Sequence, residues 1–302
     1  SPPYRTSVYA NEEHYTYFEL YQLSFDGTDM QISEVEQLSP SAMLPSWYTL
    51  NGGMSNAIGD GDDLLLGMVV EDPWGGTGSG VMRWNRDGDK WHTVLFVPVT
   101  GNDGSSEPSL IRDVDGALLF CARGTDEKDE NDIRVWRSAD GGEVWAKCIH
   151  VSGVISEAPV TINQAANGTP YIAADVYQAY MYPRGSRLRL LKNAAGQVRG
   201  GGWTRDTLCI WPLNAERTGL VEPVVARSCR AEFGVPPGDS AWRADHPVAA
   251  TVHLADGQWH NILGYRLVEV AELTHATPPT PQTGAYLEEV ITQGQAVPAW
   301  NW

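Results

Sequence analysis

Short apolar or alternating runs, separated by Asp-Gly and Asn-Gly turns, dominate the hydrophobic pattern of this chain. Few stretches keep the period of about 3.6 residues that an amphipathic helix needs. Strands of roughly four to eight residues with turn signals between them fit the pattern along most of the chain. The pattern therefore predicts an all-β protein.

The strand-like runs recur with a period of about fifty residues. Units start near Met54 and at Ser106, Ser156 and Asp245, and each has a polar residue followed by Pro or Ala, a strand, a turn and a second strand. A second hairpin follows each of the first three units. Four strands in about fifty residues is the size of a propeller blade. The chain is therefore predicted to form one β-propeller of five to six four-stranded blades over residues 1–302.

The two ends of the chain are predicted to complete this ring. Residues 7–35 supply only the later strands of a blade, and GAYLEEVITQ (284–293) offers a strand to pair with them. Such pairing would close the ring and cover its edges. A sixth blade is placed around residues 219–233 or upstream of Ser1. The Pro- and Thr-rich segment 274–284 is predicted to be an extended, exposed linker.

Polar residues occupy the same position in the repeats, at the start of the first strand of each unit. In a propeller these strands line the central channel, so their first residues open onto one rim. We therefore predict a ring of polar side chains around one cavity, formed by Asn56, Glu107, Glu157, Glu222 and His246. The alternative is that these side chains cap strand ends or bind ordered water.

The second strands of the units end near the same rim and add candidate substrate-binding residues. These are Arg123, Asp175, Tyr177, Tyr265 and Arg266, with Arg184 and Arg187 further along the chain. Arg123 and Arg187 are suited to a sugar carboxylate because the guanidinium group makes planar two-point contacts. Surface ion pairing is the alternative role for these arginines.

Two carboxyl groups facing one pocket are what glycosidic cleavage needs, one protonated and the other acting as base, nucleophile or stabiliser. Glu107 and Glu157, in adjacent units, are the predicted pair. Asp245 and His246 offer a further acid–base pair, because histidine titrates near neutral pH.

Residues 138–145 match Ser-x-Asp-x-Gly-x-x-Trp, through Ser138, Asp140, Gly142 and Trp145. Asp140 is predicted to accept hydrogen bonds from its own tight turn, Gly142 to take a positive φ, and Trp145 to fold back over the hairpin. The motif resembles the Asp-box repeat of sialidases and related propellers. Because an outer hairpin turn lies far from the central pocket, Asp140 is predicted to be structural.

The resemblance implies a sialidase-like propeller over residues 45–270 and a sugar substrate. Sialidases use three Arg around the substrate carboxylate and a Tyr nucleophile backed by Glu; here Arg123, Tyr265 and Glu222 stand for these. The chain has no Arg-Ile-Pro-like motif near its beginning, and the other two arginines are not assigned. Sugar chemistry other than sialic acid cleavage is therefore expected.

The composition excludes several classes of partner, and it gives an expectation for the cellular compartment. The net charge is −17, which repels nucleic acid, and no apolar run is long enough to span a membrane. The cysteines and histidines lack metal-ligand spacing, so neither a metal nor another cofactor is expected. Cys209 and Cys229 flank an irregular loop and are the better disulfide candidates. A secreted protein, extracellular or periplasmic, is expected, with its oligomeric state open.

Three functions remain in competition. The first is a glycoside hydrolase that acts on a glycan or polysaccharide with Glu107 and Glu157. The second is a polysaccharide lyase that acts on uronic acids, for which His246, Arg123 and Tyr177 or Tyr265 would matter more. The third is a propeller that binds sugar or protein without catalysis.

Overall fold

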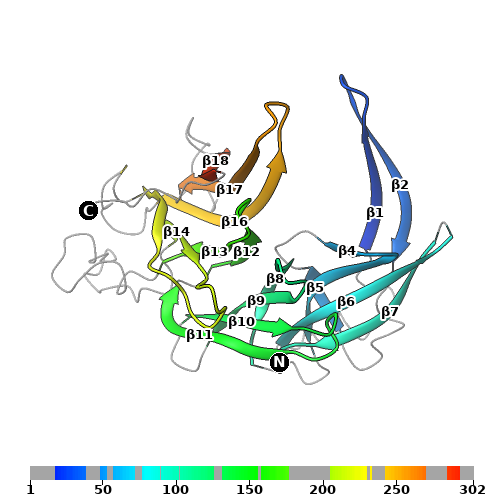
Figure 1. Cartoon of the computed structure of the whole chain (residues 1–302), viewed down its shortest axis with the longest axis horizontal. Helices are drawn as coiled ribbons and strands as arrows, with labels where there is room; N and C mark the ends of the chain where they lie inside the picture. The colour runs from blue at the N-terminus through cyan, green and yellow to red at the C-terminus, as the bar shows by residue number, and fades with distance from the viewer. Residues whose placement is uncertain are drawn as a thin grey trace.

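The computed structural model describes residues 18–38, 48–52, 57–71, 77–88, 90–101, 103–125, 131–155, 158–176, 205–229, 232, 242–269 and 284–292. In this part of the chain the regular elements are antiparallel β-strands, numbered in Figure 1. The all-β prediction is confirmed.

Two complete sheets follow directly from the repeat. The second sheet has the order β11-β10-β9-β8 and the third β12-β13-β14-β15. Their strands are β8 (Ser106–Arg112), β9 (Leu118–Thr125), β10 (Asn131–Ser138), β11 (Ala146–Ile155), β12 (Thr161–Gln164), β13 (Pro170–Asp175), β14 (Thr207–Pro212) and β15 (Val224–Ser228).

The first and fourth sheets depart from the four-stranded pattern. In the first, two short strands share the inner position and both pair with β5, and the order continues through β6 to β7. The fourth has the order β16-β17-β18. Their strands are β3 (Tyr48–Gly52), β4 (Ile58–Asp60), β5 (Asp63–Glu71), β6 (Thr77–Asp87), β7 (Lys90–Pro98), β16 (Trp242–His253), β17 (Trp259–Glu269) and β18 (Gly284–Thr292).

The sheets are arranged as blades around a common centre (Figure 1). The first strand of each sheet is innermost: β8 lies against β5 on one side and against β12 on the other, and β12 lies against β16. Residues of β4, β8, β12 and β16 line one central cavity. This radial order of antiparallel sheets is that of a β-propeller.

The predicted number of blades is wrong for the described residues, which form four sheets of three or more strands. The segment assigned to a sixth blade supplies β15, the outermost strand of the third sheet. The hairpin β1 (Phe18–Phe25) and β2 (Met30–Leu38) is a separate two-stranded sheet, and β18 pairs with β17 rather than with this hairpin. The predicted number of blades is too high because a strand pattern along the sequence does not show which sheet each strand joins. Residues 274–283 of the predicted linker lie outside the described residues.

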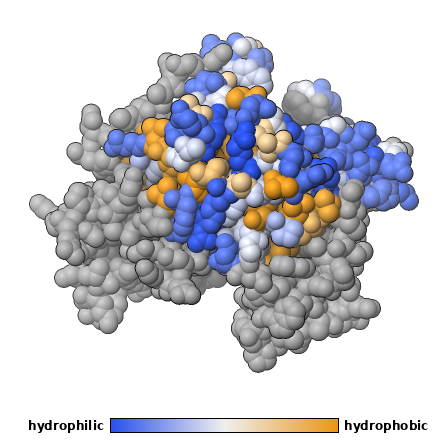
Figure 2. All heavy atoms as spheres, turned by 60° about the horizontal axis from the view of Figure 1, so that its bottom comes forward, coloured by the Kyte–Doolittle hydropathy of each residue, from blue (hydrophilic) through white to orange (hydrophobic). Residues whose placement is uncertain are grey.

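Apolar side chains fill the spaces between neighbouring sheets. One buried cluster joins the second and third sheets through Ile133, Val160 and Trp211. Another joins the third and fourth sheets through Tyr171 and Leu263. On the face in Figure 2, by contrast, the apolar side chains form several patches separated by polar ones. Burial between the blades therefore holds the inner strands in place.

The disulfide prediction is wrong, because Cys209 and Cys229 are free thiols. Cys209 packs in the cluster between the second and third sheets, whereas Cys229 packs in the cluster between the third and fourth. The two thiols thus belong to different cores, which their positions along the sequence do not reveal. Among the described residues there is also no helix long and apolar enough to cross a bilayer.

Candidate functional site

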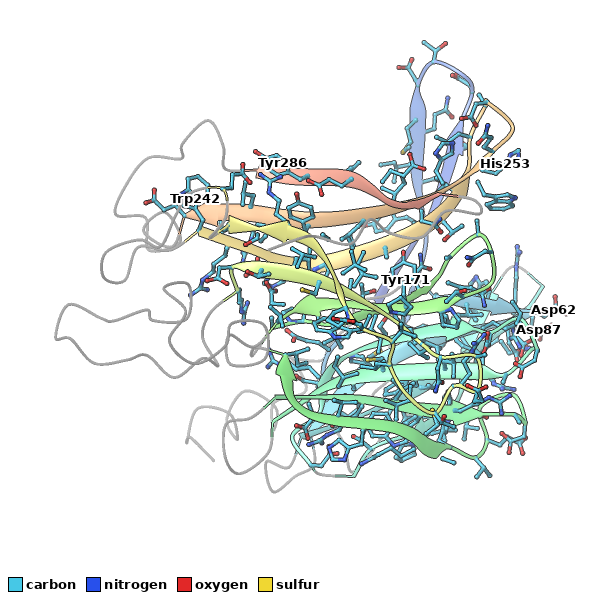
Figure 3. All side chains as sticks on the ribbon, turned by 60° about the vertical axis from the view of Figure 1, so that its left-hand side comes forward. Asp62, Asp87, Tyr171, Trp242, His253 and Tyr286 are labelled. Atoms are coloured by element: carbon cyan, nitrogen blue, oxygen red, sulfur yellow. The ribbon has the colours of Figure 1, made fainter. Side chains whose placement is uncertain are left out.

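The alternating strand directions give the propeller two rims. We call the start rim the end at which β8, β12 and β16 begin and β9, β13 and β17 finish, and the end rim the opposite end. Figure 3 shows both: Trp242, where β16 begins, lies far from His253, where it finishes, and Asp62 and Asp87 lie toward the same side as His253. Two members of the predicted polar ring, Glu107 and His246, lie at the start rim.

Glu107 lies at the start of β8, next to Pro108, in a left-handed backbone conformation with φ of 52°. The pairing of β8 with β9 shifts register here, between Ser106 and Ser109. Nη1 of Arg123 lies 3.0 Å from Oε2 of Glu107, and both side chains are about one-fifth exposed, at 19% and 22%. Glu107 and Arg123, both predicted at this rim, therefore form an ion pair with each other.

His246 repeats this local geometry in β16. It precedes Pro247, its φ is 56°, and the register of β16 with β17 shifts between Asp245 and Val248. A left-handed conformation is costly for a residue with a Cβ atom, and such residues cluster at functional sites. Bulges of this kind re-aim a side chain. Two residues at the same position of the repeat thus share a strained backbone.

The carboxylate of Asp245 lies against the ring of His246. Its Oδ1 lies 3.0 Å from Nδ1 of His246, whose side chain is 39% exposed, whereas Asp245 itself is fully buried. Arg266 grips the same carboxylate by two bonds, Nε to Oδ1 at 2.8 Å and Nη2 to Oδ2 at 2.9 Å, and Nη1 of Arg205 lies 3.2 Å from Oδ2. Burial alone raises the pKa of Asp245, but the contacts with His246 and Arg266 outweigh burial and lower it. Asp245 is therefore an anion at neutral pH.

Asp175 has the opposite electrostatics. It ends β13 at the start rim, it is fully buried, and neither carboxyl oxygen has a hydrogen-bond partner among the described residues. Burial, and then the negative charge of Asp245, raise its pKa well above the usual value. Burial without a hydrogen-bond partner therefore favours the protonated form of Asp175. The sequence placed it near this rim as a binding residue only; its signal is a carboxyl at the end of an apolar strand.

Tyr265 belongs to a different polar group. Its hydroxyl donates to Oε1 of Glu288 at 2.5 Å and accepts from Nη1 of Arg227 at 2.9 Å. The ring is buried in the cluster between the third and fourth sheets and stacks on Tyr286. Burial, followed by the bond to Glu288, raises the pKa of Tyr265. The hydroxyl is thus neutral and committed to Glu288, and the predicted pairing of Tyr265 with Glu222 is wrong.

Glu222 is also misplaced by the sequence analysis. It is an exposed residue just before β15, in the connection from β14 to β15. That connection turns at the end rim, because β14 runs in the same direction as β12. The Glu-Pro pair that suggested an inner strand in fact introduces an outermost strand.

Five predicted site residues lie outside the described residues, namely Asn56, Glu157, Tyr177, Arg184 and Arg187. Their roles stay predictions. Among the described residues no group of three or more His, Cys, Asp or Glu side chains is placed to hold a metal ion.

The turn at 138–145 is a closed local network on the outer side of the second sheet. The Ser138 hydroxyl donates to Oδ1 of Asp140 at 2.6 Å, and that oxygen also accepts from the backbone N–H of Glu143 and Val144. Gly142 has φ of 97°, and its carbonyl accepts the indole N–H of Trp145 at 3.0 Å. The bond from Ser138 is the main cause that lowers the pKa of Asp140. Asp140 therefore acts inside its own turn.

A cavity of about 490 Å³ lies at the end rim, at the opposite end of the propeller from Glu107 and His246. Its walls come from the later parts of the inner strands and from the first residue of β17: Ala57, Ile58, Leu110, Ile111, Arg112, Ile162, Asn163, Gln164, Ala165, Ala166, Ala249, Ala250, Thr251 and Trp259. This cavity could not be predicted from the sequence. Its residues are mostly small or apolar and carry no acid–base pattern.

Comparison with known proteins gives likenesses to solved structures only. No protein-family model matches the chain, and no curated protein matches it. A sialidase from Trypanosoma rangeli in complex with sialic acid is 16% identical over 92% of this chain and 44% of that one, with a TM-score of 0.47.

Two further structures show likeness at a similar level. A protein of unknown function from Dyadobacter fermentans is 14% identical, over 92% of this chain and 73% of that one, with a TM-score of 0.49. A xylan β-1,4-xylosidase from Bacillus halodurans is 10% identical, over 77% and 42%, with a TM-score of 0.45. The chain spans less than half of the length of the sialidase and of the xylosidase.

Proposed function

We propose that this chain is a carbohydrate-active enzyme that cleaves a glycosidic bond at the start rim, as a glycoside hydrolase. One arrangement carries the proposal: fully buried Asp245 lies 3.0 Å from the half-exposed His246, and the buried Asp175 of the adjacent blade has its pKa shifted in the opposite direction to that of Asp245. Burial raises the pKa of Asp175, whereas the contacts with His246 and Arg266 lower the pKa of Asp245. Environments that push the pKa values of neighbouring groups apart are the signature of acid–base sites.

His246 is the proton donor in this proposal. Oδ1 of Asp245 lies 3.0 Å from Nδ1 of His246, so the other ring nitrogen, Nε2, is left for the substrate. From there the histidine transfers its proton to the oxygen of the departing sugar as the bond breaks. Asp245 acts through the histidine and is a positioning residue.

Glu107 is the second acid–base group, at the same rim. Arg123 holds its carboxylate in place, and an ionised carboxylate can take a proton from the attacking water or stabilise positive charge on the sugar ring. Glu157 stays a candidate for the same role.

Cleavage of a uronic acid polymer by β-elimination is a second candidate, and Arg266 favours it. Its side chain is 40% exposed and lies on the carboxylate that holds His246. Nε and Nη2 of Arg266 bind Asp245, so Nη1 is left to contact a sugar carboxylate, and such a contact makes the adjacent carbon more acidic.

A glycan panel separates these functions. The panel contains neutral polysaccharides and polymers of uronic acids, and both reducing ends and ultraviolet absorbance are followed. Hydrolysis yields reducing ends without absorbance, and elimination yields an absorbing unsaturated product. Activity of either kind should fall in His246→Ala. A wild-type protein that yields neither signal on any glycan would overturn the proposal.

A further inference from the structure

We infer that the end-rim cavity is a second, non-catalytic binding site for a neutral saccharide chain, with Trp259 as its stacking surface. The cavity lies at the opposite end of the central channel from Glu107 and His246, and the inference does not depend on the chemistry proposed there. Its volume of about 490 Å³ is within the range of roughly 300–1,000 Å³ that small-molecule sites have.

The cavity carries no uncompensated charge. Arg112 is the charged residue in its wall, and its guanidinium is already engaged: Nη2 lies 3.0 Å from Oδ1 of Asp60, and Nη1 donates to the carbonyl of Gly116 at 3.1 Å. A cation would have no partner of opposite charge among the lining residues, and an anion would have to compete with Asp60 for Arg112. The cavity therefore selects a neutral ligand.

Two side-chain amide groups in the wall have oxygen atoms that can accept hydrogen bonds from that ligand. Nδ2 of Asn163 donates to the hydroxyls of Tyr171 and Thr251, at 3.1 and 3.3 Å. The Nε2 atom of Gln164 donates to Oδ1 of Asp113 at 3.2 Å and to the carbonyl of Gly168 at 3.4 Å. With the N–H groups used, the two amide oxygens accept no hydrogen bond from the described residues. They are suited to ligand hydroxyl groups, which donate.

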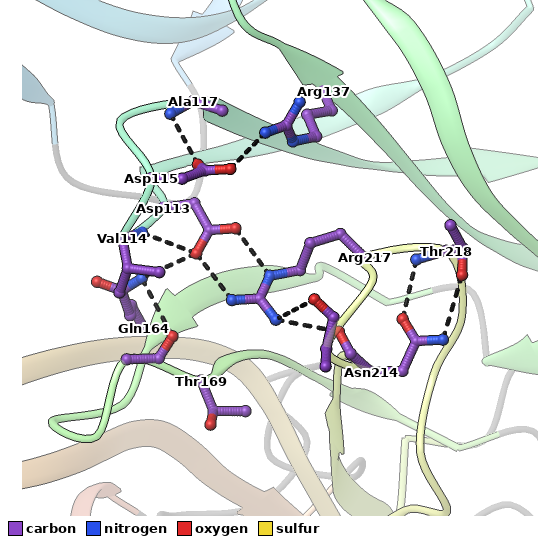
Figure 4. A network of polar contacts seen from close by, with 12 residues as sticks. Asp113, Val114, Asp115, Ala117, Arg137, Gln164, Thr169, Asn214, Arg217 and Thr218 are labelled. Atoms are coloured by element: carbon purple, nitrogen blue, oxygen red, sulfur yellow. Dashed lines mark hydrogen bonds and ion pairs between the residues drawn. The ribbon is translucent and has the colours of Figure 1, made fainter.

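The amide of Gln164 is held by a rigid network (Figure 4). Arg217 grips Asp113 through Nε at 2.7 Å and Nη2 at 3.0 Å, and Asp113 in turn accepts from Gln164. Arg217 also donates to the backbone carbonyl of Asn214. Such an arrangement fixes the orientation of an amide before a ligand binds.

Trp259 supplies the apolar surface that a sugar ring needs. It begins β17, lines the cavity, and is 45% exposed. His253 packs against it edge-on, with ring centroids 5.1 Å apart, which limits the freedom of the indole. A large aromatic ring at the mouth of a cavity offers an apolar face together with an N–H donor. Small alanines at 165, 166, 249 and 250 leave room for a ligand in front of it.

Titration calorimetry with defined oligosaccharides tests the inference. Cellohexaose, xylohexaose and mannohexaose are the neutral probes, and hexagalacturonate is the anionic one. The titrations use the His246→Ala background so that no probe is consumed. At least one neutral probe should bind, and Trp259→Ala should weaken its binding about tenfold or more. Asn163→Ala should weaken it as well.

Leu254→Ala is the matched control, because Leu254 is equally exposed, at 46%, in the same hairpin but does not line the cavity. This control should bind like the His246→Ala background. Circular dichroism verifies that each variant is folded. The inference is overturned if no neutral probe binds, or if binding is insensitive to Trp259→Ala. It is also overturned if Glu107→Gln, at the other rim, removes the binding.

Discussion

At the residue scale, charge and backbone strain single out the start rim. Asp175 and Asp245 are both fully buried, yet the pKa of the first is raised and that of the second is lowered, since Arg266 and His246 contact only the second. Glu107 and His246 occupy the same position of two repeats with the same left-handed backbone. These features are independent of each other, and they point to the same end of the propeller.

Asp175→Asn should stabilise the protein increasingly as pH rises. The folded-state pKa of Asp175 is raised, so its contribution to stability is complete below the unfolded pKa and is lost as pH rises towards the folded value. Asparagine cannot ionise and does not lose this contribution. We expect the difference in Tm between Asp175→Asn and wild type to grow from pH 5 to pH 8. A difference that is constant or shrinks over this range contradicts a raised pKa of Asp175 in the folded protein.

The strain at Glu107 has a measurable consequence. Glu107→Ala and Glu107→Gly both remove the ion pair with Arg123, but only glycine tolerates φ of 52° without cost. The glycine variant should be more stable than the alanine variant by roughly 1 kcal/mol. Urea denaturation at pH 7 measures this difference. Equal stability of the two variants would mean that the left-handed backbone at this position is not strained.

At the element scale, the sequence pattern predicted the positions of individual strands better than it predicted which strands pair with each other. The four strands of the second sheet follow the predicted repeat, because the apolar runs and turn residues in 106–155 are regular. The inner position of the first sheet is shared by β3 and β4, and β15 joins the third sheet. Pairing between strands distant in sequence is set by packing between blades, which period alone does not encode. The misplacement of Glu222 follows from this limit.

The turn at 138–145 should contribute to stability alone. Asp140→Ala removes an acceptor that serves Ser138, Glu143 and Val144, so the variant should unfold at a lower temperature. Because the turn lies on the outer side of its blade, turnover per folded molecule should match wild type. Thermal unfolding by circular dichroism gives the first quantity. Activity normalised to folded protein gives the second, and a loss there would place Asp140 in the mechanism.

At the scale of the whole molecule, we propose different roles for the two rims of the propeller. The start rim holds ionised and strained residues that suit bond cleavage, and the end rim holds a neutral cavity that suits binding. The start-rim site could be predicted from the sequence because acid–base residues recur there at one position of the repeat. The end-rim cavity could not be predicted, because its alanines, isoleucines and amides resemble ordinary strand sequence until the blades are assembled.

The most direct test of the central claim is the rate of glycosidic cleavage by matched variants of the two rims. On whichever glycan the wild type cleaves, His246→Gln and Glu107→Gln should each lower kcat by about 100-fold or more, the usual scale for an acid–base group. Trp259→Ala should retain kcat on a short soluble substrate. Wild-type kcat in both start-rim variants, or loss of kcat in Trp259→Ala alone, would contradict the assignment of catalysis to the start rim.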